Sequence, residues 1–279
     1  MNTKELFGME NPWEDVAAMY DPNNSECLYG YKNNYVCAGD RKVVDDYNQK
    51  VKDTSDEIIT KIPAEPWWGN PLKARLIILS LNPGYVPEVN EALAKLMQTN
   101  EVVRRQLINY KAKTLRLEAE SFLPEEEAED RCSISCKDAV NILGDWYWVK
   151  MLRQLKEDVE KESGQINEDV FYRQIALIEY CGYSSVTAKI SLPLSEEGSY
   201  GFLKKLVSYI SKKEDVRFLI MRDSYRWDKL LKEIKCSNDK ILRRKPRSRS
   251  QYITPGNFEN EVYKNIVEFL ACKGDGNVL

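Results

Sequence analysis

The sequence of 279 residues contains no histidine, so the side chain that most often serves as a general base or metal ligand is missing. Its seven cysteines include no CxxC pair, and four of them are not spaced as in a zinc or iron–sulfur site. Cys132 and Cys136 lie one helical turn apart, but two thiolates fall short of the four ligands that such sites usually need. We therefore expect no metal, no cofactor, and cysteines that are mostly reduced and buried.

Long apolar runs are missing as well. No segment approaches the roughly 18 apolar residues of a membrane-spanning helix, and residues 1–5 lack the basic and then apolar pattern of a signal peptide. Hydrophobic residues still make up 43% of the chain, enough for one large α/β domain. We expect a soluble, cytoplasmic protein with a single domain at 1–272, in which residues 1–73 elaborate a core at 74–272, and a disordered tail at 273–279.

The sequence has little excess of either charge, since 41 Lys and Arg nearly balance 44 Asp and Glu for a formal net charge of −3, but the charges are unevenly distributed. Residues 240–249 (KILRRKPRSR) contain six Lys or Arg and no acid. Such a segment suits contact with nucleic-acid phosphates, although a solvated basic strand end would look the same. The candidate DNA-binding residues are Arg243, Arg244, Lys245, Arg247 and Arg249, with Ser248, Ser250 and Gln251 as neutral phosphate contacts.

Nearly continuous apolar segments predict parallel strands that are covered on both faces. These strands are expected at 74–81, 174–180 and 216–221, with a fourth at about 240–243. Helical patterns lie between and around them, at 13–20, 41–62, 87–119, 137–161, 201–211, 227–234 and 258–272. The alternation predicts a three-layer α/β/α fold with a central four-stranded parallel sheet and with helical N-terminal and mid-chain insertions.

Ligands of such sheets bind outside the carboxyl ends of the strands, which selects the loops 82–85, 179–185 and 222–226. The first strand ends in Asn-Pro-Gly-Tyr, without the glycine patterns that bind dinucleotides or nucleoside triphosphates. The chain also lacks the GxSxG turn of α/β hydrolases. An unrelated hydrolase or transferase is therefore disfavoured.

The segment Ile77-Ile78-Leu79-Ser80-Leu81-Asn82-Pro83-Gly84-Tyr85 resembles the first active-site motif of the uracil-DNA glycosylase superfamily, particularly its mismatch-specific branch. The preceding Pro-Trp-Trp-Gly-Asn-Pro loop and the ends of the second and third strands are similar to segments of that superfamily. The resemblance implies a uracil-DNA glycosylase-like fold. It also implies hydrolysis of the bond between a base and its deoxyribose, after the nucleotide has been flipped into a pocket.

The resemblance assigns a role at the end of the first strand, but the histidine that the superfamily often supplies in its second motif is missing, so the loop after the third strand must act differently. Asn82 occupies the position that holds the attacking water, which an amide can orient but cannot deprotonate. Asp223 would activate this water or stabilise the sugar cation, although capping the following helix is an equal alternative. Arg222 or Ser224 would donate to the departing base.

The remaining candidates concern the base. Tyr85 and Trp68 would wall it by stacking, with ordinary burial as the alternative for Trp67 and Trp68. Glu179 ends a buried strand, where a carboxylate is costly unless it is paired or used. A carboxylate accepts hydrogen bonds and suits the exocyclic amine of cytosine or adenine. An ion pair with Arg222, of purely structural value, is the alternative.

These observations predict a monofunctional DNA glycosylase, because no lysine lies in the three strand-end loops to form a Schiff base. The expected target is a modified cytosine, such as the glucosylated hydroxymethylcytosine of phage DNA, which a branch of the superfamily excises in anti-phage defence. A uracil or mismatch repair glycosylase is one alternative. A non-catalytic protein that binds nucleic acid or a nucleotide is another. The expected partner is DNA, with no membrane and no obligate protein partner.

Overall fold

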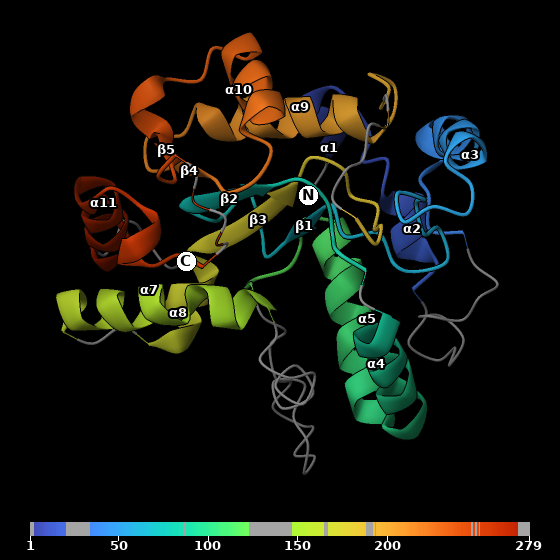
Figure 1. Cartoon of the computed structure of the whole chain (residues 1–279), viewed down its shortest axis with the longest axis horizontal. Coiled ribbons are helices and arrows are strands. Elements are labelled where there is room, and N and C mark those ends of the chain that lie inside the picture. The colour runs from blue at the N-terminus through green and yellow to red at the C-terminus, as the bar shows by residue number, and fades with distance from the viewer. Residues whose placement is uncertain are drawn as a thin grey trace.

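A mixed sheet of five strands forms the centre of the chain in the computed structural model (Figure 1). The structure describes residues 3–20, 34–85, 87–122, 147–164, 167–187, 192, 194–246, 248, 250 and 252–272. The strands are β1 (Trp67–Trp68), β2 (Leu76–Ser80), β3 (Ile175–Glu179), β4 (Arg217–Ile220) and β5 (Ile241–Arg243), in the spatial order β1-β3-β2-β4-β5. The α/β class is therefore confirmed.

The expectation of a purely four-stranded, parallel sheet is wrong in one respect. Strands β2 to β5 lie near the predicted positions and run parallel, but β1 adds an antiparallel edge in which Trp67 lies opposite Ile178. A strand of two residues cannot display strand periodicity, so no sequence pattern indicates this edge. Pro66, directly before the strand, is compatible with a position at the edge of the sheet.

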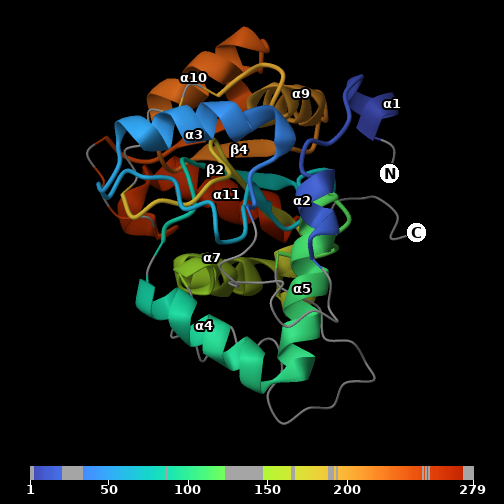
Figure 2. The same ribbon diagram turned by 90° about the vertical axis from the view of Figure 1, so that its right-hand side faces the viewer.

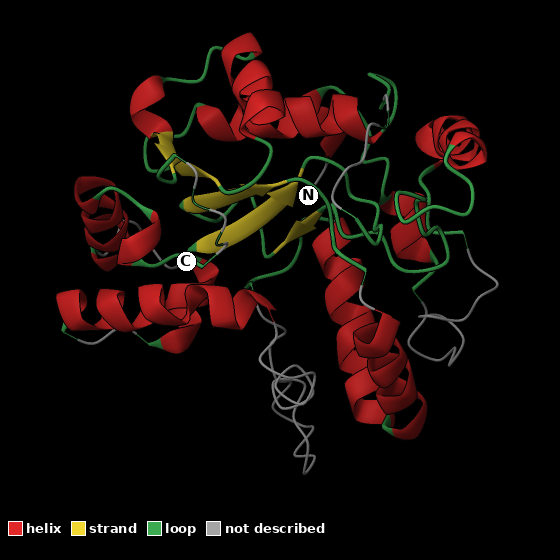
Figure 3. Ribbon diagram, in the orientation of Figure 1, coloured by secondary structure: helices red, strands yellow, loops and turns green. Residues whose placement is uncertain are grey.

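Helices surround this sheet (Figure 3). They are α1 (Thr3–Phe7), α2 (Glu14–Ala18), α3 (Arg41–Lys50), α4 (Pro87–Thr99), α5 (Glu101–Leu115), α7 (Tyr147–Ser163), α8 (Glu168–Arg173), α9 (Ser199–Ser211), α10 (Ser224–Glu233) and α11 (Asn260–Ala271). Short 3₁₀ turns occupy Ala38–Asp40, Asn238–Lys240 and Pro255–Asn257. The expected helical residues 137–146 lie outside the described residues.

Two predicted helices are shorter in the structure, for local reasons. The region 87–119 breaks at Asn100, whose side chain accepts a hydrogen bond from the backbone of Val103 and caps α5. Figure 2 shows α4 and α5 meeting at an angle there. The region 41–62 ends as a helix at Lys50, because the Asn48 side chain pairs with both backbone groups of Ile58 and folds the chain back.

Each face of the sheet is covered by helices, which is compatible with a three-layer α/β/α arrangement (Figure 1). On one face, α9 and α10 pack on a cluster that includes Ile77, Leu79 and Phe218. On the other, α7, α8 and α11 pack on a cluster that includes Leu76 and Leu177. The alternation of sides along β2 is the pleat of a strand that is buried on both faces.

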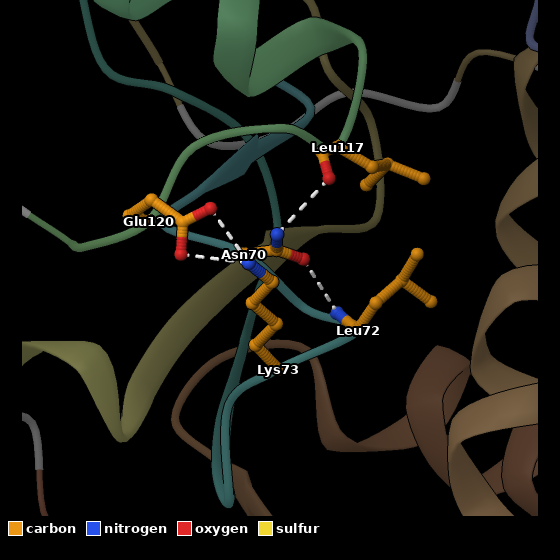
Figure 4. A network of polar contacts seen from close by, with 5 residues as sticks. All are labelled: Asn70, Leu72, Lys73, Leu117 and Glu120. Carbon is orange, nitrogen blue, oxygen red and sulfur yellow. Dashed lines mark hydrogen bonds and ion pairs between the residues drawn. The ribbon is translucent and has the colours of Figure 1, made fainter. Parts of the chain in front are cut away.

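The loop before β2 is fixed to the end of α5 by polar contacts (Figure 4). The buried Asn70 amide donates to Leu117 O and accepts from Leu72 N, both at 3.0 Å. Lys73 pairs with Glu120 at 2.6 Å on the surface beside it. These contacts hold α5 against the β1 edge.

Within the described ranges, none of the helices has the length and apolarity that crossing a membrane requires. The cysteines in those ranges are free: Cys37 and Cys181 are buried, Cys236 is half-buried, and Cys272 is exposed.

Candidate active site at the carboxyl ends of the strands

The order of the strands identifies where this sheet should bind a ligand. From β2 the chain continues to β3 on one side of the sheet, and from β4 it continues to β5 on the other side. Open α/β sheets bind ligands at the carboxyl ends where connections diverge in this way. The residues that follow β2 and β4, with the end of β3 beside them, are therefore the candidate site.

Asn82 follows β2 and is held in one orientation. Its Nδ2 donates to Pro83 O at 3.0 Å and to Ser185 Oγ at 3.1 Å. The Ser185 hydroxyl donates its single proton to Thr187 O, so it can only accept from Asn82. The backbone supports this contact, because Tyr85 N donates to Ser185 O at 3.0 Å. The Oδ1 atom of Asn82 is buried, and no described residue donates to it.

Glu179 is the last residue of β3 and lies opposite Ser80 of β2. It is 3% exposed, and within the described ranges its Oε2 has no hydrogen-bond partner. Burial raises the pKa of Glu179 to about 8. A side-chain hydrogen bond with Ser80 and the charge of Arg222 oppose this rise in pKa, whereas the charge of Glu65 adds to it. Burial therefore favours the neutral carboxyl group over the carboxylate.

A partly buried ion pair lies beside the end of β3. Lys111 of α5 pairs with Glu65, and the lysine and glutamate side chains are 8% and 23% exposed. The Lys111 ammonium also lies 5.0 Å from the centre of the Trp68 ring. These three residues line a small depression in the surface, together with Ala64, Trp67, Tyr110, Thr114 and Leu115.

The loop after β4 gives Asp223 a structural role. Asp223 has a φ of 48° and caps α10 by accepting from Arg226 N at 3.4 Å. Its Oδ2 accepts from the Arg226 guanidinium at 2.8 Å. This is the capping alternative that the sequence offered. The catalytic role of Asp223 remains a prediction, and both carboxylate oxygens are already engaged.

The neighbouring candidates differ in their access to the site. Arg222 is half-buried, and its charge lowers the pKa of Glu179, although no ion pair joins these two described residues. Ser224 is exposed in the first turn of α10. Tyr85 is half-buried and follows the Asn82 turn directly.

Trp68 is mostly buried, although it lines the depression beside the Glu65–Lys111 pair. It is 7% exposed and packs against Tyr110 and Phe122 in the core. It lies opposite Leu177, two residues before the end of β3. Trp67 is buried as well, and its indole donates to Thr114 O. Both rings therefore take the alternative role of ordinary burial.

Internal contacts occupy part of the basic segment. Arg243, at the end of β5, pairs with Asp228 at 2.6 Å. Arg244 donates to Ser250 O at 2.6 Å, and Lys245 N donates to Asn257 O at 2.9 Å. Arg247, Arg249 and Gln251 lie outside the described residues. Contact with DNA by this segment remains a prediction.

The sequence reasoning missed two parts of this site. Ser185 orients Asn82, yet nothing in a run of two serines distinguishes one of them. Lys111 carried a detectable signal, because it interrupts the apolar spacing of Val103, Leu107 and Leu115 on α5. A lysine at a buried helical position normally requires an anionic partner.

Comparisons with known proteins add no assignment: no family model matches the chain, and no curated protein or solved structure matches it significantly. Over the described residues, no group of three or more acidic or cysteine side chains is placed to hold a metal ion.

Proposed function

We propose that this chain is a monofunctional DNA glycosylase, with a uracil-DNA glycosylase-like fold, that hydrolyses the N-glycosidic bond of a flipped base. One observation carries the proposal: among the described residues, Asn82 Oδ1 and Glu179 Oε2 are buried without partners at the ends of adjacent parallel strands. Buried polar atoms are rarely left without a hydrogen bond. Their position at the carboxyl ends of neighbouring strands supports a ligand that supplies the missing partners.

In the proposed reaction, Asn82 Oδ1 accepts a hydrogen bond from the attacking water. Because Ser185 fixes the amide, this water is held in one position relative to the sugar. Positioning of this kind lowers the entropic part of the barrier. The amide does not take the proton of the water, so cleavage depends on stabilising the departing base and the sugar cation.

Glu179 is proposed to contact the base through its Watson–Crick edge. A neutral carboxyl group presents one donor and one acceptor, which match the ring nitrogen and the exocyclic amine of cytosine. We therefore propose a cytosine-type target, with glucosylated hydroxymethylcytosine of phage DNA as the first substrate to test. A uracil or mismatch repair glycosylase is the alternative outcome of the same screen.

A second candidate function is a non-catalytic protein that binds nucleic acid or a nucleotide in the same site. The engagement of Asp223 by Arg226 favours it, because the carboxylate would have to be released before it could accept a proton from water. For the glycosylase we propose that Asp223 shapes the loop at Arg222 rather than transferring a proton.

A screen of duplex oligonucleotides tests the proposal. Each duplex carries uracil, a G·T mismatch, hydroxymethylcytosine or its glucosylated form, and alkali converts excised sites into strand breaks. We expect breaks that disappear with Asn82→Ala and persist with Asn265→Ala, which removes an exposed amide on α11. Binding without breaks on every duplex would favour the second candidate.

A further inference from the structure

Glu179 has a defined set of charged and polar neighbours. Ser80 approaches from β2, Arg222 from the end of β4, and Glu65 from the loop that precedes β1. The backbone brings Glu65 close, because Pro66 O accepts from Glu179 N at 2.9 Å and Gly182 O accepts from Glu65 N at 2.8 Å. Two acidic side chains thus lie on neighbouring segments at the end of β3.

Only one of these acids has a cationic partner in the described structure. Lys111 of α5 pairs with Glu65 and lies over Trp68, so its charge is already committed. Glu179 has no ion pair among the described residues, and Arg222 remains beyond ion-pair distance. The arrangement separates the acids into Glu65, which is paired with a lysine, and Glu179, which is buried and forms no ion pair with the residues that the structure describes.

Like charges at close range disfavour a second ionisation. Burial has the largest effect on the pKa of Glu179, and the negative charge of Glu65 raises this pKa further, against Ser80 and Arg222. Two carboxyl groups whose environments differ in this way are the usual means by which a site keeps one acid protonated near neutral pH.

We propose that Glu179 is the general acid that protonates the leaving base, and that Glu65 is a positioning residue that keeps Glu179 neutral. The inference rests on the proposed glycosylase function and assigns its proton donor. The class of leaving group follows, because a base with an unprotonated ring nitrogen, as in cytosine, can take this proton.

In this step, the bond between the sugar carbon and the base nitrogen breaks, and its electron pair goes to the base. The proton of Glu179 Oε2 moves to the ring nitrogen, so the base leaves as a neutral molecule. The water on Asn82 Oδ1 adds to the sugar carbon, and its proton goes to solvent. Solvent then reprotonates Glu179.

The pH profile of single-turnover excision tests the proposal, on the duplex carrying glucosylated hydroxymethylcytosine and on its hydroxymethylcytosine counterpart. Glu179→Gln should lower the rate by roughly 10²- to 10⁴-fold across the profile. Glu65→Gln should retain the rate at pH 6 but move the alkaline limb to lower pH. Glu65→Gln leaves Lys111 unpaired, so the double variant Glu65→Gln/Lys111→Met, which removes both charges of the pair, is measured as well. The alkaline limb should move to lower pH in this variant too.

Glu120→Gln is the matched control, since it removes the acid of the exposed Lys73–Glu120 pair and should leave the profile unchanged. An alkaline limb that stays in place in both Glu65 variants overturns the inference while the glycosylase stands. If wild type excises neither base, the general acid and its cytosine-type target are rejected. Breaks on the uracil or mismatch duplexes would then still support the proposed glycosylase function. If no duplex breaks, the glycosylase function is rejected as well.

Discussion

The Asn82 amide donates to Ser185 Oγ at 3.1 Å, while the Ser185 hydroxyl donates onward to Thr187 O. Among the described residues, this relay leaves Oδ1 of Asn82 as the one unsatisfied atom of the amide. The loop after β3 therefore sets the orientation of the residue after β2.

Ser185→Ala should release the Asn82 amide and lower single-turnover excision by roughly 10- to 100-fold, because a misplaced water reacts slowly. Ser184→Ala, at the neighbouring serine that does not bond to Asn82, is the control and should remain near wild type. Equal loss in both variants would mean that the loop, rather than the relay, is required.

The stability of the protein should depend on pH through Glu179. Its pKa is about 8 in the folded chain and 4.5 ordinarily, so the unfolded chain releases this proton first as the pH rises. The stabilisation that the protonated Glu179 gives to the folded chain is fully present below pH 4.5 and is lost as the pH rises to about 8. Over that range the free energy of unfolding falls by at most about 1.4 kcal/mol per pH unit. Denaturant unfolding of wild type and Glu179→Gln at pH 5 and pH 8 measures it.

Glu179→Gln should lose less stability than wild type between these two pH values. Glu120→Gln, which alters an exposed glutamate, should keep the wild-type slope. Parallel slopes in all three proteins would show that Glu179 is already ionised at neutral pH.

The buried pair of Lys111 and Glu65 should be costly to break from one side. Lys111→Met leaves a largely buried carboxylate unpaired and should lower the free energy of unfolding by about 3–5 kcal/mol. Adding Glu65→Gln should restore most of that loss. Lys73→Met, in the exposed pair with Glu120, should cost less than about 1 kcal/mol. Similar losses at both lysines would indicate that the pair is solvated.

The two roles of Asp223 can be separated by substitution. Asn caps helices and tolerates a positive φ, so Asp223→Asn should retain both stability and excision if the residue is a cap. Asp223→Ala should lower the free energy of unfolding by roughly 1–2 kcal/mol. A stable Asp223→Asn variant that has lost excision would instead make Asp223 catalytic.

The basic segment should contribute to the salt dependence of DNA binding. Replacing Arg243 and Lys245 together by Ala should reduce the slope of log affinity against log salt by about one for each phosphate that is no longer neutralised. Lys264→Ala on α11 is the control. A slope unchanged from wild type would remove this segment from the interface.

The sequence predicted what depends on local pattern. The apolar runs located β2 and β3 because these strands are buried on both faces, and their ends located Asn82 and Glu179. The break between α4 and α5 was missed because one capping asparagine outweighed a continuous helical pattern.

Long-range pairing was beyond such reasoning. The ion pair of Glu65 and Lys111 joins residues 46 positions apart, and no local pattern specifies the partner of a buried lysine. The protonation state of Glu179 depends on the same tertiary contacts. Packing in the core is equally hard to foresee, since nothing near Trp68 in the sequence indicates that its ring packs against Tyr110 and Phe122.

Release of the free base shows whether this chain is a glycosylase, which is the claim on which the other proposals depend. Wild type, Asn82→Ala and Glu179→Gln are incubated with duplex DNA containing glucosylated hydroxymethylcytosine, and mass spectrometry measures the free base and the abasic strand. We predict equal amounts of both products from wild type and neither product from Asn82→Ala, with at most traces from Glu179→Gln. Intact DNA after incubation with wild type, or undiminished release by Asn82→Ala, would contradict the claim.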